Sequence, residues 1–265
     1  MLNKQLHSWV LWVAAAMFAV CSCADYAQEL STYWDGHDFT SLKGFEDIRK
    51  AEEKFDGYID LLTKVSHEEA VKNLRSFLDS AAQDTVAYMV WSGWFEPYFH
   101  ANQSPYKNDD LYVAWLDMAL EDKVIDDGSM MEHLQYMRDV MDKNQVGTTL
   151  SEVIVRDTVG DEFNLSEFVK KESMILLVDA NCPSCLKSLE ENVSAYADAD
   201  LIAVLVGGGD YHITNIRRQV SEDILEKWTL VCVSKRRMEE ALYDTSLLPV
   251  RLLVSSEGEI IKSYH

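Results

Sequence analysis

Residues 174–185 read Met-Ile-Leu-Leu-Val-Asp-Ala-Asn-Cys-Pro-Ser-Cys. The first five form a continuous apolar run, which is typical of a parallel strand that is buried on both faces. Cys182 and Cys185 follow closely, and a C-x-x-C that comes after a strand and opens a helix has the spacing of a redox motif. This stretch therefore predicts an α/β domain with a dithiol at the carboxyl end of a central strand.

The position of Cys182 at the start of a helix has a chemical consequence. Backbone N–H groups and the positive end of the helix dipole stabilise a thiolate there, and such sites lower the pKa of a cysteine from about 8.5 to roughly 3.5–7.5. The thiolate is the species that attacks disulfides. We therefore expect Cys182 to be the exposed nucleophile and Cys185, one turn later, to be the buried thiol that releases the mixed disulfide. Pro183 suits the first helical turn, where its missing N–H costs nothing.

Two other uses of this cysteine pair compete with redox chemistry. Structural zinc needs four ligands, and because no second C-x-x-C occurs, we expect no metal and no cofactor. A merely structural disulfide between Cys182 and Cys185 is the second alternative. Cys232 lies alone in a predicted strand, where an inert core residue is expected. The run 207–209, Gly-Gly-Gly, also follows a strand, but no Lys-Ser/Thr pair follows it, so we interpret it as a loop and not as a phosphate cradle.

Strand and helix patterns alternate on both sides of the cysteine pair. Strands are indicated by short apolar runs, helices fall between them, and two hairpins are expected, one before and one after this core. The predicted strands cover 174–178, 201–206, 230–233 and 250–254, the helices 185–198 and 213–227, and the hairpins 153–165 and 250–261. These elements predict a mixed central sheet flanked by helices, which we assign to residues 146–265.

The preceding residues, 24–145, have a helical pattern. Ser66 starts a capping box, and apolar residues then recur on one helical face. Asn108 precedes a second amphipathic run. We predict an all-α domain of four to six helices, whose aromatic stretch from Trp91 to Phe99 packs in the core. A short polar linker at 143–150 follows it.

The second domain resembles a known family. Residues 151–264 are similar to the thioredoxin-like domain of the TlpA/ResA group of envelope thiol–disulfide oxidoreductases, and the likeness rests on Cys-Pro-Ser-Cys after a strand, on Asn164-Leu-Ser-Glu-Phe168 and on Leu248-Pro249 before Val-Arg-Leu-Leu-Val. The resemblance implies thiol–disulfide exchange at Cys182 and Cys185. It also implies that Pro249 is the family's cis-proline, whose neighbouring backbone faces the cysteines and pairs with substrate.

Two residues near the cysteines depart from the family pattern. Asn181 stands where the family usually has a Trp, so the packing of substrate is expected to differ. Leu176 stands where thioredoxin has a buried Asp. Asp179 is the nearest acid and is our candidate proton acceptor. Its side chain also occupies the position of the Thr that peroxiredoxins need, which disfavours a peroxidase.

The chain ends at His265, before the last helix that is usual in this fold. A helix of that kind hides on the order of 400 Å² of apolar surface, worth roughly 10 kcal/mol at about 25 cal/mol per Å². We therefore expect either a truncated chain or another cover for that face of the sheet. The helical domain is the cover that we predict.

The first domain is similar to a helical domain of unknown function that precedes thioredoxin-like domains in bacterial envelope lipoproteins. The similarity is carried by Tyr33-Trp34-Asp35 and by Gln103-Ser-Pro-Tyr-Lys-Asn-Asp-Asp-Leu-Tyr112. The resemblances together cover nearly all of the chain after residue 23. They predict an all-α domain followed by a thioredoxin-like α/β domain.

Residues 1–22 have the pattern of a lipoprotein signal peptide. A lysine precedes the apolar run Trp9–Val20, which is too short to span a bilayer and is typical of a secretory signal. The following Cys-Ser-Cys resembles a lipobox in which Cys23 receives the lipid; Cys21 fits less well, because the bulky Val20 would precede it. We expect a lipid anchor on Cys23 that holds the protein on a membrane, facing the periplasm. An ordinary cleaved signal is the alternative.

The charge excludes one class of partner. With 45 acidic and 24 basic side chains, the net charge of −21 repels phosphate backbones and argues against nucleic acid. The expected partners are envelope proteins with disulfides or thiols, a membrane redox partner, and the membrane itself. The leading hypothesis is an envelope disulfide reductase or isomerase. The alternative is a non-catalytic lipoprotein binding module with a structural disulfide on a thioredoxin-like scaffold.

Overall fold

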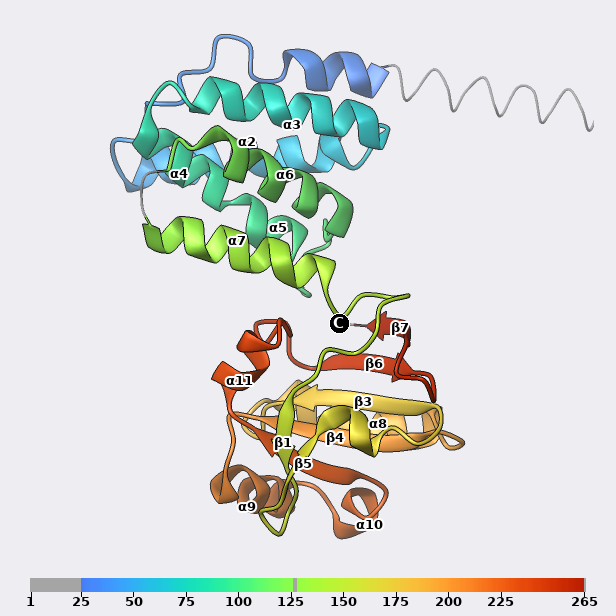
Figure 1. The fold of residues 1–265 in the computed structure, drawn as a ribbon. Helices are drawn as coiled ribbons and strands as arrows, with labels where there is room; N and C mark the ends of the chain where they lie inside the picture. Colours follow the sequence, from blue (N-terminus) through green and yellow to red (C-terminus); the bar gives the residue numbers. More distant parts are fainter. Residues whose placement is uncertain (1–24, 126–127, 265) are drawn as a thin grey trace, which may run out of the picture. The chain divides into compact units, whose positions relative to one another are not determined.

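The protein is represented by a computed structural model that describes residues 25–125 and 128–264. The chain divides into two compact units, Met1–Gln135 and Tyr136–His265 (Figure 1). The first is helical and the second is built around a sheet, as the sequence predicts.

The first unit consists of helices, and two of them begin at the caps that the sequence predicts. The side chain of Ser66 accepts a hydrogen bond from the N–H of Glu69, and that of Asn108 accepts one from Leu111, which confirms both predicted helix starts. Residues 25–32 are also helical, so the described part of the chain holds one helix more than the upper limit we predicted. The labelled helices are α2 (Phe45–Leu62), α3 (His67–Ala81), α4 (Thr85–Gly93), α5 (Phe95–Phe99), α6 (Asp109–Asp122) and α7 (Gly128–Asp142), the last of which continues across the boundary into the second unit.

Aromatic side chains form the core of this helical unit. Phe55 of α2 is fully buried, and its ring centroid lies 4.9 Å from that of Phe95. The ring centroid of Phe77 of α3 lies 5.4 Å from that of Phe95 and 5.9 Å from that of Trp91. Trp91 and Phe99 are also fully buried. Trp94 and Tyr98 of the same stretch are only partly buried. The prediction of core packing is therefore confirmed for Trp91, Phe95 and Phe99.

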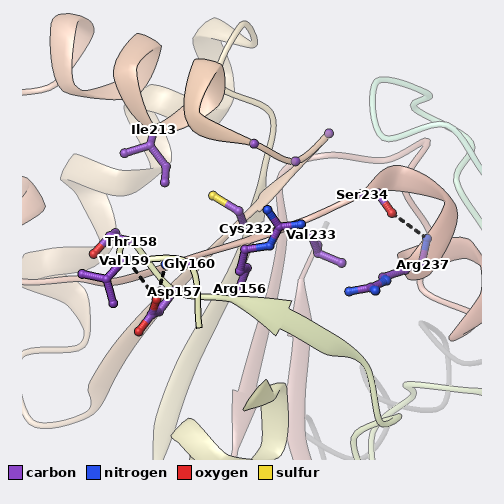
Figure 2. Close-up of a pocket in the computed structure, with 13 residues that line it drawn as sticks. Arg156, Asp157, Thr158, Val159, Gly160, Ile213, Cys232, Val233, Ser234 and Arg237 are labelled. Atoms are coloured by element: carbon purple, nitrogen blue, oxygen red, sulfur yellow. Dashed lines mark hydrogen bonds between the residues drawn. The ribbon is translucent and has the colours of Figure 1, made fainter. Parts of the chain in front are cut away.

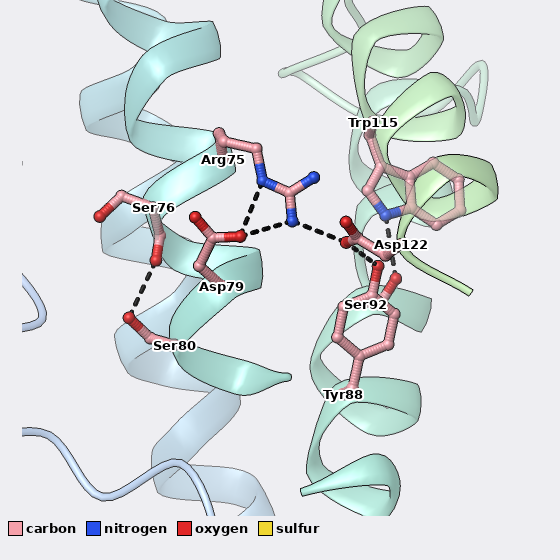
Figure 3. A network of polar contacts seen from close by, with 8 residues as sticks. All are labelled: Arg75, Ser76, Asp79, Ser80, Tyr88, Ser92, Trp115 and Asp122. Atoms are coloured by element: carbon pink, nitrogen blue, oxygen red, sulfur yellow. Dashed lines mark hydrogen bonds and ion pairs between the residues drawn. The ribbon is translucent and has the colours of Figure 1, made fainter. Parts of the chain in front are cut away.

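One polar network links three helices of this unit (Figure 3). Asp122 of α6 accepts a hydrogen bond from Arg75 of α3 at 2.7 Å and another from the hydroxyl of Tyr88 of α4 at 2.8 Å. The side chain of Asp122 is only 13% exposed. Arg75 also pairs with Asp79, whose side chain is 65% exposed. The two carboxylates thus share one guanidinium but differ in how far water screens them.

Replacing the buried carboxylate should therefore cost more than replacing the exposed one. We expect Asp122→Ala to lower the free energy of unfolding by about 2 kcal/mol, because it leaves two donors without their acceptor. Asp79→Ala is the matched control, with an expected loss of about 0–1 kcal/mol. Urea unfolding followed by circular dichroism measures both. Equal losses of unfolding free energy would show that the burial of Asp122 does not make its interaction with Arg75 stronger than that of Asp79.

The second unit contains a seven-stranded mixed sheet in the order β2-β1-β5-β4-β3-β6-β7. The strands β3, β4 and β5 are parallel, whereas β1 and β6 run antiparallel to their neighbours β5 and β3. Every strand that the sequence predicts is present. The strands are β1 (Ile154–Arg156), β2 (Glu162–Asn164), β3 (Ser173–Val178), β4 (Asp200–Val206), β5 (Thr229–Val233), β6 (Val250–Val254) and β7 (Ile260–Tyr264).

The helices of this unit differ from prediction in two places. The stretch predicted as one helix at 213–227 is two helices, because the backbone becomes extended at Val220 and Ser221. A six-residue helix after β5 was not predicted, since it is too short to show a helical period. The helical elements are η1 (Leu165–Phe168), α8 (Pro183–Ala195), α9 (Asp210–Gln219), α10 (Glu222–Leu225) and α11 (Lys235–Glu240).

β3 lies inside the sheet, and both of its faces are buried. Leu176 and its neighbours at alternate positions join a cluster with Cys185 and Leu189 of α8 and Ile216 of α9. Leu177, on the opposite face, joins a second cluster. Because successive side chains of a strand point to opposite faces, one apolar run supplies both cores. The carboxyl end of β3 is thereby fixed in position.

One face of the sheet is packed by residues of its own unit. The second cluster includes Leu150, Leu165 of η1, Met238 of α11 and Tyr243. Asn144, which we predicted in a polar linker, is buried; its side chain donates to the carbonyl of Leu242 at 3.0 Å and accepts from the N–H of Ser151 at 2.9 Å. Residues of the second unit therefore cover this face of the sheet. The predicted docking of the helical domain on the face that the last helix would cover stays a prediction.

Candidate active site

Cys182 is the N-cap of α8. Its sulfur accepts a hydrogen bond from the backbone N–H of Cys185 at 3.3 Å and lies 3.0 Å from the hydroxyl oxygen of Ser184. Pro183 occupies the first helical turn. The Cys182 side chain is partly exposed, while Cys185 is fully buried beneath the helix. The arrangement of one accessible sulfur and one buried sulfur agrees with the roles that the sequence predicts for them.

The surroundings shift the pKa values of the two thiols in opposite directions. Partial burial works to raise the pKa of Cys182, but hydrogen bonds from Cys185 and Ser184 together outweigh it and leave that pKa below its usual range. Burial raises the pKa of Cys185 to about 12, helped by its hydrogen bond to Cys182. Near neutral pH, the thiolate is therefore concentrated on the accessible sulfur.

A hydrogen-bonded loop connects β3 to the cysteines. The N–H of Cys182 donates to the carbonyl oxygen of Asp179 at 3.1 Å. The Asp179 carboxylate accepts from the backbone and the side chain of Asn181, at 2.7 and 3.1 Å. Asn181 is exposed. The residue that replaces the usual Trp therefore helps to fold the loop, and the candidate proton acceptor Asp179 also has a structural task there.

Two amide side chains of α9 hold the same loop from the other side. Asn215 donates to the carbonyl of Ala180 at 3.1 Å and to the side-chain oxygen of Asn181 at 2.8 Å. Gln219, one turn later, donates to the Ala180 carbonyl at 3.0 Å. Sequence reasoning missed both residues, because contacts between distant segments leave no local pattern.

Pro249 lies at the same end of the sheet as the cysteines. The Leu248–Pro249 peptide bond is cis, as the family resemblance implies. β6 begins at the next residue, and Val250 pairs with Leu177 of β3. One step further along this antiparallel register, Pro249 is opposite Val178, the last residue of β3. Leu248 packs against the cluster that Cys182 also contacts.

Comparisons with known proteins agree with this fold. The model of the domain of unknown function DUF5106 matches residues 24–144. A thioredoxin-like protein from Bacteroides caccae is similar over 91% of this chain and 88% of its own, with a TM-score of 0.67 and 15% identity. The chain thus combines a region that matches the DUF5106 model with a domain that has the thioredoxin-like fold. No curated protein matches the sequence.

Further solved structures match the thioredoxin-like domain. One is the thioredoxin domain of a thiol-disulfide oxidoreductase from Bacteroides vulgatus, with 20% identity, a TM-score of 0.37 and coverage of 45% of this chain and 88% of that one. Another is a thiol:disulfide interchange protein from a Bacteroides species, with 19% identity, a TM-score of 0.37 and coverage of 44% and 80%.

The other described cysteine, Cys232, belongs to the same buried cluster as Cys185. Cys232 of the thioredoxin-like domain is a thiol on β5 that is 6% exposed, which fits the predicted core residue. Cys21 and Cys23 lie outside the described residues. Within the described ranges, no cluster of three or more acidic, His or Cys side chains is arranged to hold a metal ion.

The opposite pKa shifts predict how the thiols react with pH. Because the pKa of Cys182 is lowered, its thiolate forms at a lower pH than that of an ordinary cysteine. The rate of its alkylation by iodoacetamide should rise with pH and level off above that lowered pKa. Cys185 should react only in strongly alkaline solution. Peptide mass spectrometry of the reduced full chain measures each rate; preferential labelling of Cys185 near pH 7 would reverse the assignment.

Ser184 supplies a sharper version of this test. Ser184→Ala removes a hydrogen bond to the Cys182 sulfur, so the alkylation curve of Cys182 should move to higher pH by about half to one pH unit. Ser194→Ala is the control on the same helix, since within the described ranges that hydroxyl bonds only to the carbonyl of Glu191. An unmoved curve in Ser184→Ala would show that the hydroxyl does not stabilise the thiolate.

The contact between α9 and the loop can be tested by hydrogen exchange. Asn215→Leu removes the donor to Ala180 and Asn181, so the amide of Cys182 should exchange faster and the free energy of unfolding should fall by about 1 kcal/mol. Thr214→Ala changes an exposed neighbour on α9 and should alter neither. Unchanged exchange at Cys182 in Asn215→Leu would mean that α9 does not hold the loop.

Proposed function

We propose that the protein exchanges thiols and disulfides through Cys182 and Cys185, and that it acts as a disulfide reductase or isomerase on proteins of the cell envelope. The Cys182 thiolate attacks one sulfur of a substrate disulfide and forms a mixed disulfide, while the other substrate sulfur leaves as a thiolate. Cys185 then loses its proton and attacks Cys182. The substrate gains two electrons as a dithiol, and the cysteine pair becomes a disulfide.

The observation that carries this proposal is the difference between the two sulfurs. A structural disulfide needs neither an accessible sulfur nor a thiolate. Here, hydrogen bonds at the start of α8 lower the pKa of Cys182, whereas burial raises that of Cys185. Reactive cysteines are typically found in such surroundings, where the sulfur is partly exposed and its thiolate is stabilised. The attacking and the resolving roles are thereby separated.

The position of Pro249 supports a substrate-binding role beside the cysteines. Its cis bond precedes β6, next to the carboxyl end of β3. In our proposal, backbone groups of Leu248 and Pro249 pair with the substrate chain, and the exposed Asn181 contacts it where the family has a Trp.

The proposed location rests on the N-terminal sequence. Val20-Cys-Ser-Cys23 follows a short apolar run in the manner of a lipobox, and a lipid on Cys23 would hold the thioredoxin-like domain at a membrane of the envelope. In the described part of the chain, no helix combines the length and the apolar composition needed to cross a bilayer. A membrane redox partner would return the disulfide to the dithiol.

Trapping tests the exchange reaction. Cys185→Ser leaves the nucleophile but removes the resolving thiol, so envelope proteins should accumulate as mixed disulfides on Cys182 in the native host. Cys182→Ser should trap nothing and should abolish reduction of insulin, whereas Cys232→Ser should behave as the unmodified chain does. If Cys185→Ser captures no protein and the unmodified chain does not reduce insulin, the non-catalytic binding module is the better function.

The anchor has its own test. Cys23→Ser should release the protein from the membrane fraction, because the acyl chains have no other point of attachment. Cys21→Ser is the matched control and should leave the protein on the membrane. A Cys23→Ser variant that stays membrane-bound contradicts lipidation at that residue.

A further inference from the structure

A cavity of about 440 Å³ lies in the thioredoxin-like domain, where β4 and β5 end (Figure 2). Its walls come from the glycine run 207–209 after β4, from Ser234 after β5, and from the turn after β1. Ligands of α/β sheets bind outside the carboxyl ends of the strands, and small-molecule pockets span about 300–1,000 Å³. The cavity is thus large enough for a small organic molecule. It plays no part in the proposed cysteine chemistry.

Two arginines from different elements line this cavity. Arg156 ends β1 and pairs in register with Cys232 of β5, so the two side chains lie next to each other on one face of the sheet. The second arginine is Arg237 of α11, and Figure 2 shows it together with Arg156 and Cys232. Among the described residues, Arg156 has no hydrogen-bond or ion-pair partner. In a chain with almost twice as many acidic as basic side chains, two guanidinium groups at one cavity are notable.

The described acidic groups near the cavity leave these charges available. Among the cavity-lining side chains that the structure describes, Asp157 is the only acidic one, and its Oδ1 atom accepts hydrogen bonds from three backbone N–H groups of its own turn. Glu162 pairs with Arg237 at 3.0 Å, but both side chains are about half exposed. Exposed pairs of this kind contribute about 0–1 kcal/mol, so an anion can compete for Arg237.

The glycine loop closes the cavity with main chain instead of side chains. Gly207, Gly208 and Gly209 all have positive φ angles, of 117°, 69° and 103°. A Cβ atom on Gly208 would lie 3.2 Å from the backbone nitrogen of Ser234, so the loop packs directly on the end of β5. Apart from its two chain neighbours, no described atom lies within 4 Å of a Cβ on Gly209. The loop therefore needs glycine for its conformation.

We propose that this cavity binds a small organic anion, whose phosphate or carboxylate group is held between the guanidinium groups of Arg156 and Arg237. Guanidinium is suited to both groups, because its planar N–H donors match two oxygens at once. The remaining volume, next to Cys232 and Ile213, accommodates the less polar part of the ligand. The glycine loop shapes the cavity, and the arginines supply the attraction.

Isothermal titration of the full chain tests this site with two probes, pyrophosphate for the phosphate group and citrate for the carboxylate group. At about 0.15 M salt, the Debye length of about 8 Å suppresses diffuse attraction. At least one probe should bind saturably with one site per chain. Arg156→Gln and Arg237→Gln should each weaken its dissociation constant about tenfold, since each removes charge-assisted hydrogen bonds.

Arg236→Gln is the matched control. Arg236 precedes Arg237 on α11, is highly exposed, and pairs with Glu240 away from the cavity wall. Its replacement removes the same charge and should leave the dissociation constant unchanged. Circular dichroism checks that all three variants are folded. The proposal is overturned if neither probe binds saturably, or if Arg236→Gln weakens binding as much as the two cavity variants. Because no cysteine is altered, loss of this site leaves the exchange reaction untouched.

Discussion

The hydrogen bond from the backbone N–H of Cys185 to the sulfur of Cys182, at 3.3 Å, links the fold to the chemistry. It exists because a cysteine occupies the N-cap, where helix N–H groups have no partner within the helix. The side chain of an N-cap residue usually accepts through an oxygen atom. Here the acceptor is a sulfur, and the hydrogen bonds from these donors stabilise the thiolate more than the thiol. The same turn of α8 directs the side chain of Cys185 into the core, where ionisation of its thiol is disfavoured.

The rest of the thioredoxin-like domain keeps this turn in place. β3 pairs with β4 on one side and β6 on the other, so its carboxyl end cannot move without breaking the sheet. α8 is tied to the sheet by Arg251, which donates to Ser188 at 3.0 Å. It is also tied to the residue directly before β5, because Trp228 donates to the carbonyl of Leu189 at 3.2 Å. The amides of α9 hold the connecting loop. Pre-formed donors need no rearrangement when charge develops on the sulfur.

The features that were predictable from the sequence are those with a local pattern. The runs at 174–178, 201–206 and 230–233 predicted their strands, because strands buried on both faces must be apolar throughout. The position of the cysteines after one such run placed them at a helix start without further information. The caps at Ser66 and Asn108 were predictable for the same reason, since the acceptor and its donor are three residues apart.

Features that depend on contacts between distant segments were not predictable. Asn215 reads as an ordinary polar residue of a helix until α9 is placed beside the loop at Ala180. Asn144 reads as part of a linker until Leu242 and Ser151 are brought to it. Arg156 and Cys232 meet only through the register of β1 on β5. A single sequence records none of these pairings, and the cavity at the glycine loop follows from all of the elements around it.

The reduction potential of the cysteine pair tests the central claim most directly. The full chain is equilibrated with mixtures of reduced and oxidised dithiothreitol or glutathione, and the state of each cysteine is read by mass spectrometry. The account predicts one two-electron transition that joins Cys182 to Cys185 at a potential above about −300 mV, with Cys232 remaining a thiol. The account is contradicted if the Cys182–Cys185 disulfide has a reduction potential below about −300 mV, as structural disulfides do. It is also contradicted if no Cys182–Cys185 disulfide forms under any of these conditions.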